Sequence, residues 1–176
     1  MNTRDRIMES ALKLFLKKGY DASSISMIMK EVGISKSTFF HYFNTKQDLL
    51  NEIYLKCKQD FTYYQYGDYN IFTFVDDNYR FSIEHREELE FMIYYESSPY
   101  IYQETIEEGM SYHQDIINLI TSLQEKNEII NIPVHMLCKI IANVLLESID
   151  FVVIDNEINE DNLNIVKKLL NNMLIP

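Results

Sequence analysis

The feature that most constrains the fold of this chain is its scarcity of residues that interrupt helices. Of 176 residues, only 4 are glycine and 3 are proline. These two residue types end helices and mark the turns between strands, so long segments without them favour helices. With 47% hydrophobic residues, a chain of this length can also bury a sizeable core. The sequence therefore predicts an all-α fold.

Charge is distributed unevenly along the chain. The formal net charge is −11, yet residues 1–58 contain ten Lys or Arg and six Asp or Glu, a net charge of +4. The basic charge of residues 1–58 indicates that this segment binds a polyanion. The strongly acidic remainder of the chain excludes general nucleic-acid adhesion by that part. A net charge of +4 also fits ordinary variation of surface charge, so the motifs must decide.

Three short helices are predicted in the basic segment. Thr3 can cap the first helix, and Gly19 ends it. Ser24 can cap the second helix, and Gly33 supplies a tight turn before Ser35, which can cap the third. Two short helices that flank a turn predict a helix-turn-helix unit.

The third helix has an apolar side and a polar side. Phe39 and Phe43 fall on one side of the helical wheel, and Ser37, Thr38 and His41 fall opposite. A helix that reads DNA needs short polar side chains toward the base edges and hydrogen-bond donors at its margins for the phosphates. Taken singly, each polar residue has an alternative role as a helix cap or a solvated charge. The predicted DNA-binding residues are Ser24, Ser35, Lys36, Ser37, Thr38, His41, Tyr42 and Lys46.

An ordered set of residues in this segment is specific to one family. The set consists of Phe15, Gly19, Tyr20, Gly33, Ser35, Lys36, Thr38, Tyr42, Phe43, Lys46 and Leu49. With it, the segment from Arg6 to Tyr54 resembles the N-terminal DNA-binding domain of the TetR (tetracycline repressor) family of bacterial transcription regulators. The resemblance implies a helix-turn-helix DNA-binding domain, here expected over residues 1–45. A helical effector-binding and dimerisation domain is expected over residues 46–176.

Some positions depart from the pattern of that family. Ser23 and Ser24 stand where a pair of threonines is common, and they keep the hydroxyl groups. Phe40 stands where tyrosine is usual and lacks a phenol for a phosphate, which Tyr42 can partly replace.

Two amphipathic helices are predicted at the end of the chain, where apolar residues recur at helical spacing over 137–152 and 163–173. In the family that the N-terminal segment resembles, the last two helices form a four-helix bundle with those of a second subunit. The predicted dimer interface consists of Ile141, Val144, Leu145, Ile149, Val166, Leu170 and Met173. Periodicity indicates burial without identifying the partner, so burial within one subunit is the alternative.

Aromatic residues, mostly tyrosines, are concentrated in the middle of the chain. A tyrosine has a flat apolar body and a polar tip, which suits a pocket for an organic molecule. The predicted pocket residues are Tyr63, Phe81, Phe91, Tyr94, Tyr95 and Tyr112. Neighbouring acidic residues such as Glu96 make an aromatic or aliphatic cation one candidate effector, and the charge of the effector stays open. Core packing of the aromatics and solvation of the carboxylates are the alternatives.

Signatures of enzymes and membrane proteins are missing from the sequence. No histidine follows a glutamate at the spacing of a dinuclear metal centre, and no Gly-rich phosphate loop, GxSxG motif or zinc-type Cys/His cluster occurs. Cys57 and Cys138 lack CxxC spacing and are interpreted as packed thiols. We expect no catalytic residue, metal or cofactor. The chain also starts without an apolar signal stretch, and charges interrupt its most apolar segment, so a cytoplasmic location is expected.

The combined prediction is a homodimeric, TetR-like transcription regulator. It is expected to act as a repressor that binds a palindromic double-stranded DNA operator and responds to a small organic effector, with no membrane partner. The alternative function is a helix-turn-helix adaptor that acts through protein contacts and uses no effector.

Overall fold

The computed structural model describes residues 1–62, 80–155 and 157–175. Its helices are α1 (Thr3–Lys18), α2 (Ile25–Val32), α3 (Lys36–Tyr42), α4 (Lys46–Thr62), α6 (Arg86–Tyr95), α7 (Gln103–Ser111), α8 (Gln114–Glu125), α9 (Val134–Val152) and α10 (Glu160–Leu174). The strands β1 (Val153–Ile154) and β2 (Glu157–Ile158) form a small antiparallel hairpin between α9 and α10. The all-α prediction is confirmed, with this hairpin as the exception among the described residues.

The N-terminal helices begin at side chains that cap them. Asn2 caps α1 by accepting a hydrogen bond from the Asp5 amide, so the predicted cap at Thr3 is wrong by one residue. Ser24 and Ser35 cap α2 and α3 as predicted, each accepting a hydrogen bond from an amide in the first turn. Each cap satisfies an amide that the first turn of a helix leaves unpaired.

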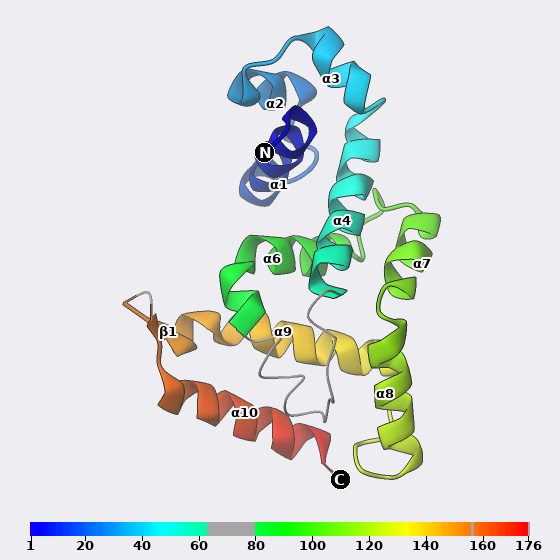
Figure 1. The fold of residues 1–176 in the computed structure, drawn as a ribbon, viewed down its shortest axis with the longest axis vertical. Coiled ribbons are helices and arrows are strands. Elements are labelled where there is room, and N and C mark those ends of the chain that lie inside the picture. The colour runs from blue at the N-terminus through cyan, green and yellow to red at the C-terminus, as the bar shows by residue number, and fades with distance from the viewer. Residues whose placement is uncertain (63–79, 156, 176) are drawn as a thin grey trace.

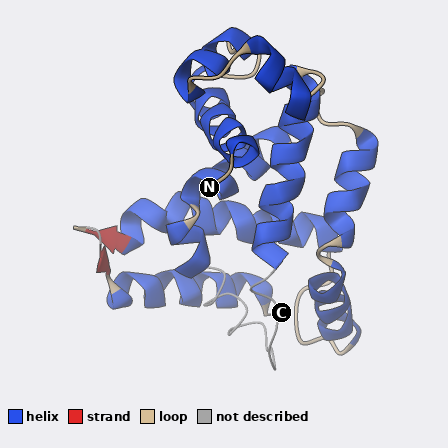
Figure 2. Cartoon of the chain, turned by 45° about the horizontal axis from the view of Figure 1, so that its top comes forward, coloured by secondary structure: helices blue, strands red, loops and turns tan. Residues whose placement is uncertain are grey.

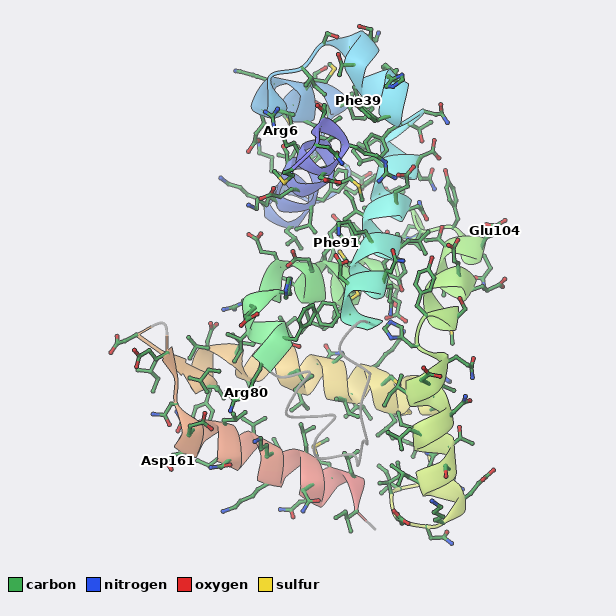
Figure 3. All side chains as sticks on the ribbon, in the orientation of Figure 1. Arg6, Phe39, Arg80, Phe91, Glu104 and Asp161 are labelled. Carbon is green, nitrogen blue, oxygen red and sulfur yellow. The ribbon has the colours of Figure 1, made fainter. Side chains whose placement is uncertain are left out.

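Gly33 makes the turn between α2 and α3. Its φ of 74° and ψ of 40° lie in the left-handed region, where a side chain costs about 1–2 kcal/mol. The amides of Gly33 and Ile34 both donate to the carbonyl oxygen of Met29. These two hydrogen bonds close the C-terminal end of α2. On α1, the Arg6 guanidinium donates to the Val32 carbonyl oxygen at 2.8 Å and ties the two helices together (Figure 3).

Helices α1 to α3 and the first half of α4 enclose a hydrophobic core. Each helix contributes at least one fully buried residue, and these include Ile7, Phe15, Ile28, Phe39 and Leu49. This packing stabilises short helices that would not persist alone in water.

The helices are gathered into two groups at opposite ends of the molecule. Figure 1 shows α1, α2 and α3 at one end and the antiparallel α9 and α10 side by side at the other. Helix α6 contacts α1, α4 and α9, so it lies between the groups. The turned view in Figure 2 shows that helices make up nearly all of the described chain, with the two short strands at one edge. Helix α7 packs against α4, and α8 packs against α9.

The predicted boundary between the two domains falls in the turn between α3 and α4. Helix α4 belongs to both sides of this boundary, because Leu49 and Leu50 at its start are buried with the N-terminal helices, while Phe61 near its end packs on Phe81. Between α7 and α8, the chain leaves helical geometry at Tyr112 and His113. None of the helices within the described ranges is both long and apolar enough to span a bilayer.

Candidate functional site

Helix α3 turns one side inward and presents the other to solvent. Phe39 and Phe43 are 0% and 2% exposed, and their rings pack at 5.9 Å between centroids. Ser37 and His41 are exposed on the opposite side, and Lys36 is exposed at the margin between the two sides. The two-sided helix inferred from the sequence is therefore confirmed as a packing arrangement.

Hydroxyl groups cluster at the start of α3. The Ser35 Oγ lies 2.8 Å from both the Ser37 Oγ and the Thr38 Oγ1, and it accepts a hydrogen bond from the Thr38 amide at 3.1 Å. These contacts fix three short polar side chains close to the backbone. A helix surface with such short side chains allows its backbone to approach the base edges of a major groove closely.

Longer side chains border this polar face. Tyr42 is half-buried, and its ring packs against His41 at 4.9 Å between centroids. Phe40 is 42% exposed, and the Lys36 ammonium lies 5.9 Å from its ring centroid. Ser24 is half-buried at the start of α2. All predicted DNA-binding residues therefore lie in or beside the helix-turn-helix unit, and their contacts with DNA stay predictions.

Lys46 has a structural role that the sequence did not reveal. Its Nζ donates to the carbonyl oxygens of Tyr20 and Ser23 at 2.7 and 2.8 Å, and it lies 3.9 Å from the centroid of the Tyr20 ring. Burial lowers the pKa of the Lys46 ammonium. Two of its three hydrogens thus tie the start of α4 to the α1–α2 connection, which leaves one for the predicted phosphate contact.

A cavity of about 580 Å³ lies in the other part of the molecule, in the size range of ligand pockets. Among the described residues, α4, α6, α8 and α9 supply most of its lining. Its walls are mainly aliphatic, and they include Leu89, Met92, Ile116, Ile120 and Leu145.

None of the predicted pocket aromatics is among the described residues that line this cavity. Phe81, Phe91 and Tyr95 are buried in the core, since large aromatic side chains gain most from complete burial. Tyr94 is 69% exposed, and the Tyr112 hydroxyl donates to Glu108 on the surface of α7. Tyr63 lies outside the described residues. The predicted lining is therefore corrected to aliphatic residues with a few charged ones.

The charged groups of the cavity lie close together. The Lys139 Nζ is 3.6 Å from Glu96 Oε1, and the Lys58 Nζ is 4.0 Å from Glu96 Oε2. Burial lowers the pKa of Lys58, and the nearby Glu96 opposes that shift. Burial, together with the charge of Lys58, lowers the pKa of His113 to about 4, so this imidazole is neutral at neutral pH. In the sequence, the one signal of this cluster is that Lys139 interrupts the most apolar segment of the chain.

Two connections join the cavity to the N-terminal helices. Tyr95 on α6 donates from its hydroxyl to the Phe15 carbonyl oxygen on α1 at 3.1 Å. The turn after α6 makes the second connection, because the Tyr100 ring stacks on Tyr20 with 4.1 Å between centroids and its hydroxyl donates to Asp21. In the sequence, both connections come just after residues of α6 that line the cavity.

The same turn is anchored on α4 by hydrogen bonds between side chains of α4 and the backbone of the turn. Gln47 and the buried Asn51 both donate to the Tyr100 carbonyl oxygen, at 3.0 and 2.9 Å. Asn51 also accepts from the Tyr102 amide at 2.8 Å. A displacement of this turn would therefore act on the start of α4, next to the helix-turn-helix unit.

Most of the predicted dimer residues are buried within the chain. They are Ile141, Leu145, Ile149, Val166 and Leu170, and each is at most 4% exposed. Helices α9 and α10 pack against each other, and Ile141 and Leu145 line the cavity. Burial within one subunit, the alternative to a dimer face, therefore fits these five residues. Val144 is half-buried, and Met173 is 38% exposed. Other exposed apolar residues of the two helices are Met136, Phe151, Ile165 and Leu169.

The N-terminal segment matches a known family. Residues 7–53 match the model of bacterial regulatory proteins of the tetR family. Over 44 residues, the chain is 52% identical to the uncharacterized HTH-type transcriptional regulator YuxN of Bacillus subtilis. The matched segment covers 25% of this chain and 15% of the relative. Over 58 residues it is 33% identical to IcaR of Staphylococcus aureus, the negative transcriptional regulator of the biofilm operon icaADBC. That match spans 33% of this chain and 31% of the relative.

Solved structures match the whole fold at low sequence identity. A tetR family transcription regulator from Shewanella sp. PV-4 has a TM-score of 0.82 and 21% identity, over 99% of this chain and 98% of its own. AibR, solved with isovaleryl coenzyme A and operator DNA, has a TM-score of 0.69 and 14% identity, over 99% and 100% of the two chains. Likeness at these identities concerns the fold alone.

Proposed function

We propose that this chain, whose residues 7–53 match the model of bacterial regulatory proteins of the tetR family, regulates transcription as a repressor that releases its operator when an effector binds. The observation that carries the proposal is the construction of α3. Its aromatic side is buried, and its exposed side carries Ser37 and His41 within a helix-turn-helix unit. This arrangement suits a helix that enters the major groove. Residues 1–45 form the proposed DNA-binding domain.

Within this unit, we assign two kinds of contact to the polar residues. Ser37, Thr38 and His41 are proposed to meet base edges, because they lie on the side of α3 opposite its buried aromatics. The residues at the margins of this face are proposed to meet phosphates, which position the helix without specifying sequence. They are Ser24, Ser35, Lys36, Tyr42 and Lys46.

A second copy of the chain is the proposed partner. A homodimer would present two α3 helices to successive major grooves of a palindromic operator. Exposed apolar residues of α9 and α10, including Phe151, Ile165, Leu169 and Met173, support an interface at the end of the molecule remote from α3 (Figure 1). Within residues 46–176, dimerisation and effector binding would thus share α9.

The cavity is the proposed effector site. It is lined by α6, whose Tyr95 is hydrogen-bonded to α1, and α6 is followed by the turn that is hydrogen-bonded to α4. An effector that binds one position of α6 better than another would shift the balance between two arrangements of the DNA-binding domains. The structure of AibR, a protein of this fold, contains both isovaleryl coenzyme A and operator DNA, which supports a small-molecule site in addition to DNA binding.

A DNA titration at increasing salt concentration tests the proposed function. Duplex affinity should fall steeply with salt, because each neutralised phosphate contributes about −0.9 to the slope of log affinity against log salt. Lys36→Ala should make this slope less steep, because one phosphate contact is lost. The control Lys126→Ala, which replaces an exposed lysine between α8 and α9, should leave the slope unchanged. Absence of duplex binding at every salt concentration would contradict a DNA-binding function and favour the protein adaptor.

A further inference from the structure

Phe40 places an aromatic ring at the surface of α3. Within this helix, all of whose residues the structure describes, it is the one large apolar side chain that is exposed, at 42%. Its ring packs edge-on against the buried Phe39, with 5.4 Å between centroids and 81° between the ring planes. This contact orients the ring and leaves part of its apolar surface facing outward.

The ring lies between residues with two different proposed contacts. Side chains three and four residues apart are neighbours on a helix, so Phe40 lies beside Ser37 and one turn after Lys36. The Lys36 ammonium is 5.9 Å from the centroid of the Phe40 ring. Because Ser37 is proposed to meet a base edge and Lys36 a phosphate, the ring would enter the groove together with them.

The chemistry of a phenylalanine ring limits what it can recognise in DNA. The ring has no hydrogen-bond donor or acceptor, so it cannot bind a phosphate or the polar atoms of a base edge. The major groove presents one methyl group, the C5 methyl of thymine, and apolar side chains such as phenylalanine contact it. Contact with this methyl group would also remove exposed apolar surface of the ring from water.

Thr38 is the other residue of α3 that could bring an apolar group to a thymine. Its hydroxyl lies 2.8 Å from the Ser35 Oγ, and its side chain is half-buried. The Phe40 ring is larger and more exposed, so the geometry favours Phe40.

We infer that Phe40 reads a thymine in each half of the operator by packing its ring against the C5 methyl group. The inference rests on the proposed function, because it requires α3 to enter the major groove. It adds a base preference to that function, at a residue to which the proposed base and phosphate contacts assign no role.

Replacing thymine by uracil, one position at a time, in a duplex that the wild type selects from a randomised pool tests this inference. Uracil keeps every hydrogen-bonding group of thymine and lacks only the methyl group. At one thymine in each half of the site, uracil should weaken wild-type binding about fourfold, the effect of losing one buried methyl group. Selected half-sites without thymine, or wild-type affinity that no uracil changes, would overturn the inference.

Variants assign the effect to Phe40. Phe40→Ala should bind the thymine and uracil duplexes equally at that position, whereas Phe40→Leu, which keeps an apolar side chain, should retain a preference for thymine. Thr38→Ser is the matched control, because it removes a methyl group and keeps the hydroxyl, and it should respond to uracil as the wild type does. Circular dichroism checks that each variant is folded.

Two results with these variants would overturn the inference. One is a folded Phe40→Ala that still distinguishes thymine from uracil at that position, and the other is a Thr38→Ser that does not. The Thr38→Ser comparison and the wild-type uracil series keep the inference falsifiable if Phe40→Ala fails to fold.

The selection and the uracil series separate this inference from the proposed function. If the chain enriches no duplex, the proposed function is contradicted, and the reading of thymine fails with it. If the chain enriches a duplex whose affinity does not depend on thymine methyl groups, the DNA-binding function stands and only the role of Phe40 fails.

Discussion

The Tyr95 hydroxyl on α6 and the Phe15 carbonyl oxygen on α1 are joined by a buried hydrogen bond of 3.1 Å. The Phe15 carbonyl also accepts from the Gly19 amide at 2.8 Å, so it keeps a partner if the tyrosine hydroxyl is removed. The Tyr95 bond is therefore less important for folding than for fixing α6, which lines the cavity, against the DNA-binding domain.

Tyr95→Phe should separate effector binding from DNA release. We expect the free energy of unfolding to fall by only about 1 kcal/mol, the net value of one hydrogen bond. Operator affinity without effector should be unchanged, while the loss of affinity caused by effector should become smaller. Tyr94→Phe is the control, because its side chain is 69% exposed. Equal effector responses in Tyr95→Phe and wild type would show that this bond carries no coupling.

Leu169 and Leu170 provide a matched pair that locates the dimer interface. Leu169 is 50% exposed and Leu170 is 1% exposed on the same turn of α10. Leu169→Glu should yield a folded monomer, because it places a charge only in the interface between subunits. Leu170→Glu should unfold the C-terminal helices, because an unpaired charge in the core costs several kcal/mol. Sedimentation and circular dichroism measure the two outcomes, and a folded dimer of Leu169→Glu would show that the interface lies elsewhere.

His113 should make the protein less stable in mildly acidic solution. Burial lowers its pKa from 6.5 to about 4 in the folded state. Between these pH values the unfolded chain binds more protons than the native one, so the free energy of unfolding falls as the pH falls. The contribution of His113 is up to about 3 kcal/mol, since one pKa unit corresponds to about 1.4 kcal/mol.

Urea unfolding of His113→Gln between pH 4 and pH 7 checks this assignment, over the range that the folded and unfolded pKa values define. The variant should show a flatter dependence of unfolding free energy on pH than the wild type. His135→Gln, which replaces an exposed histidine of the same cavity, should keep the wild-type dependence. Identical pH profiles for His113→Gln and wild type would rule out His113 as the source.

Local rules predicted the helix-turn-helix unit well. The caps at Ser24 and Ser35 and the turn at Gly33 depend on residues next to each other in sequence, and the inward direction of Phe39 follows from helical periodicity. The same rules could not assign Lys46 to the carbonyl groups of Tyr20 and Ser23, because that contact depends on how α4 packs against a distant loop.

Long-range packing explains the errors in the second domain. Helical periodicity marks Leu170 as buried, yet it cannot state whether the same chain or a second subunit buries it. Aromatic composition suggested a tyrosine-lined pocket, but Phe91 and Tyr95 fill the core instead. The cavity is lined by helices far apart in sequence, and only the fold brings Lys58 and Lys139 together.

The central claim, that the exposed face of α3 reads DNA bases, is tested most directly by selecting bound duplexes from a pool of randomised sequence. The wild type should enrich a site with two related halves, and His41→Ala should change the preferred bases because one good base contact is worth about 1–3 kcal/mol. Lys36→Ala should weaken binding to all duplexes alike and keep the preferred bases. If Lys36→Ala changes the selected bases and His41→Ala does not, or if the wild type enriches no sequence, the claim is contradicted.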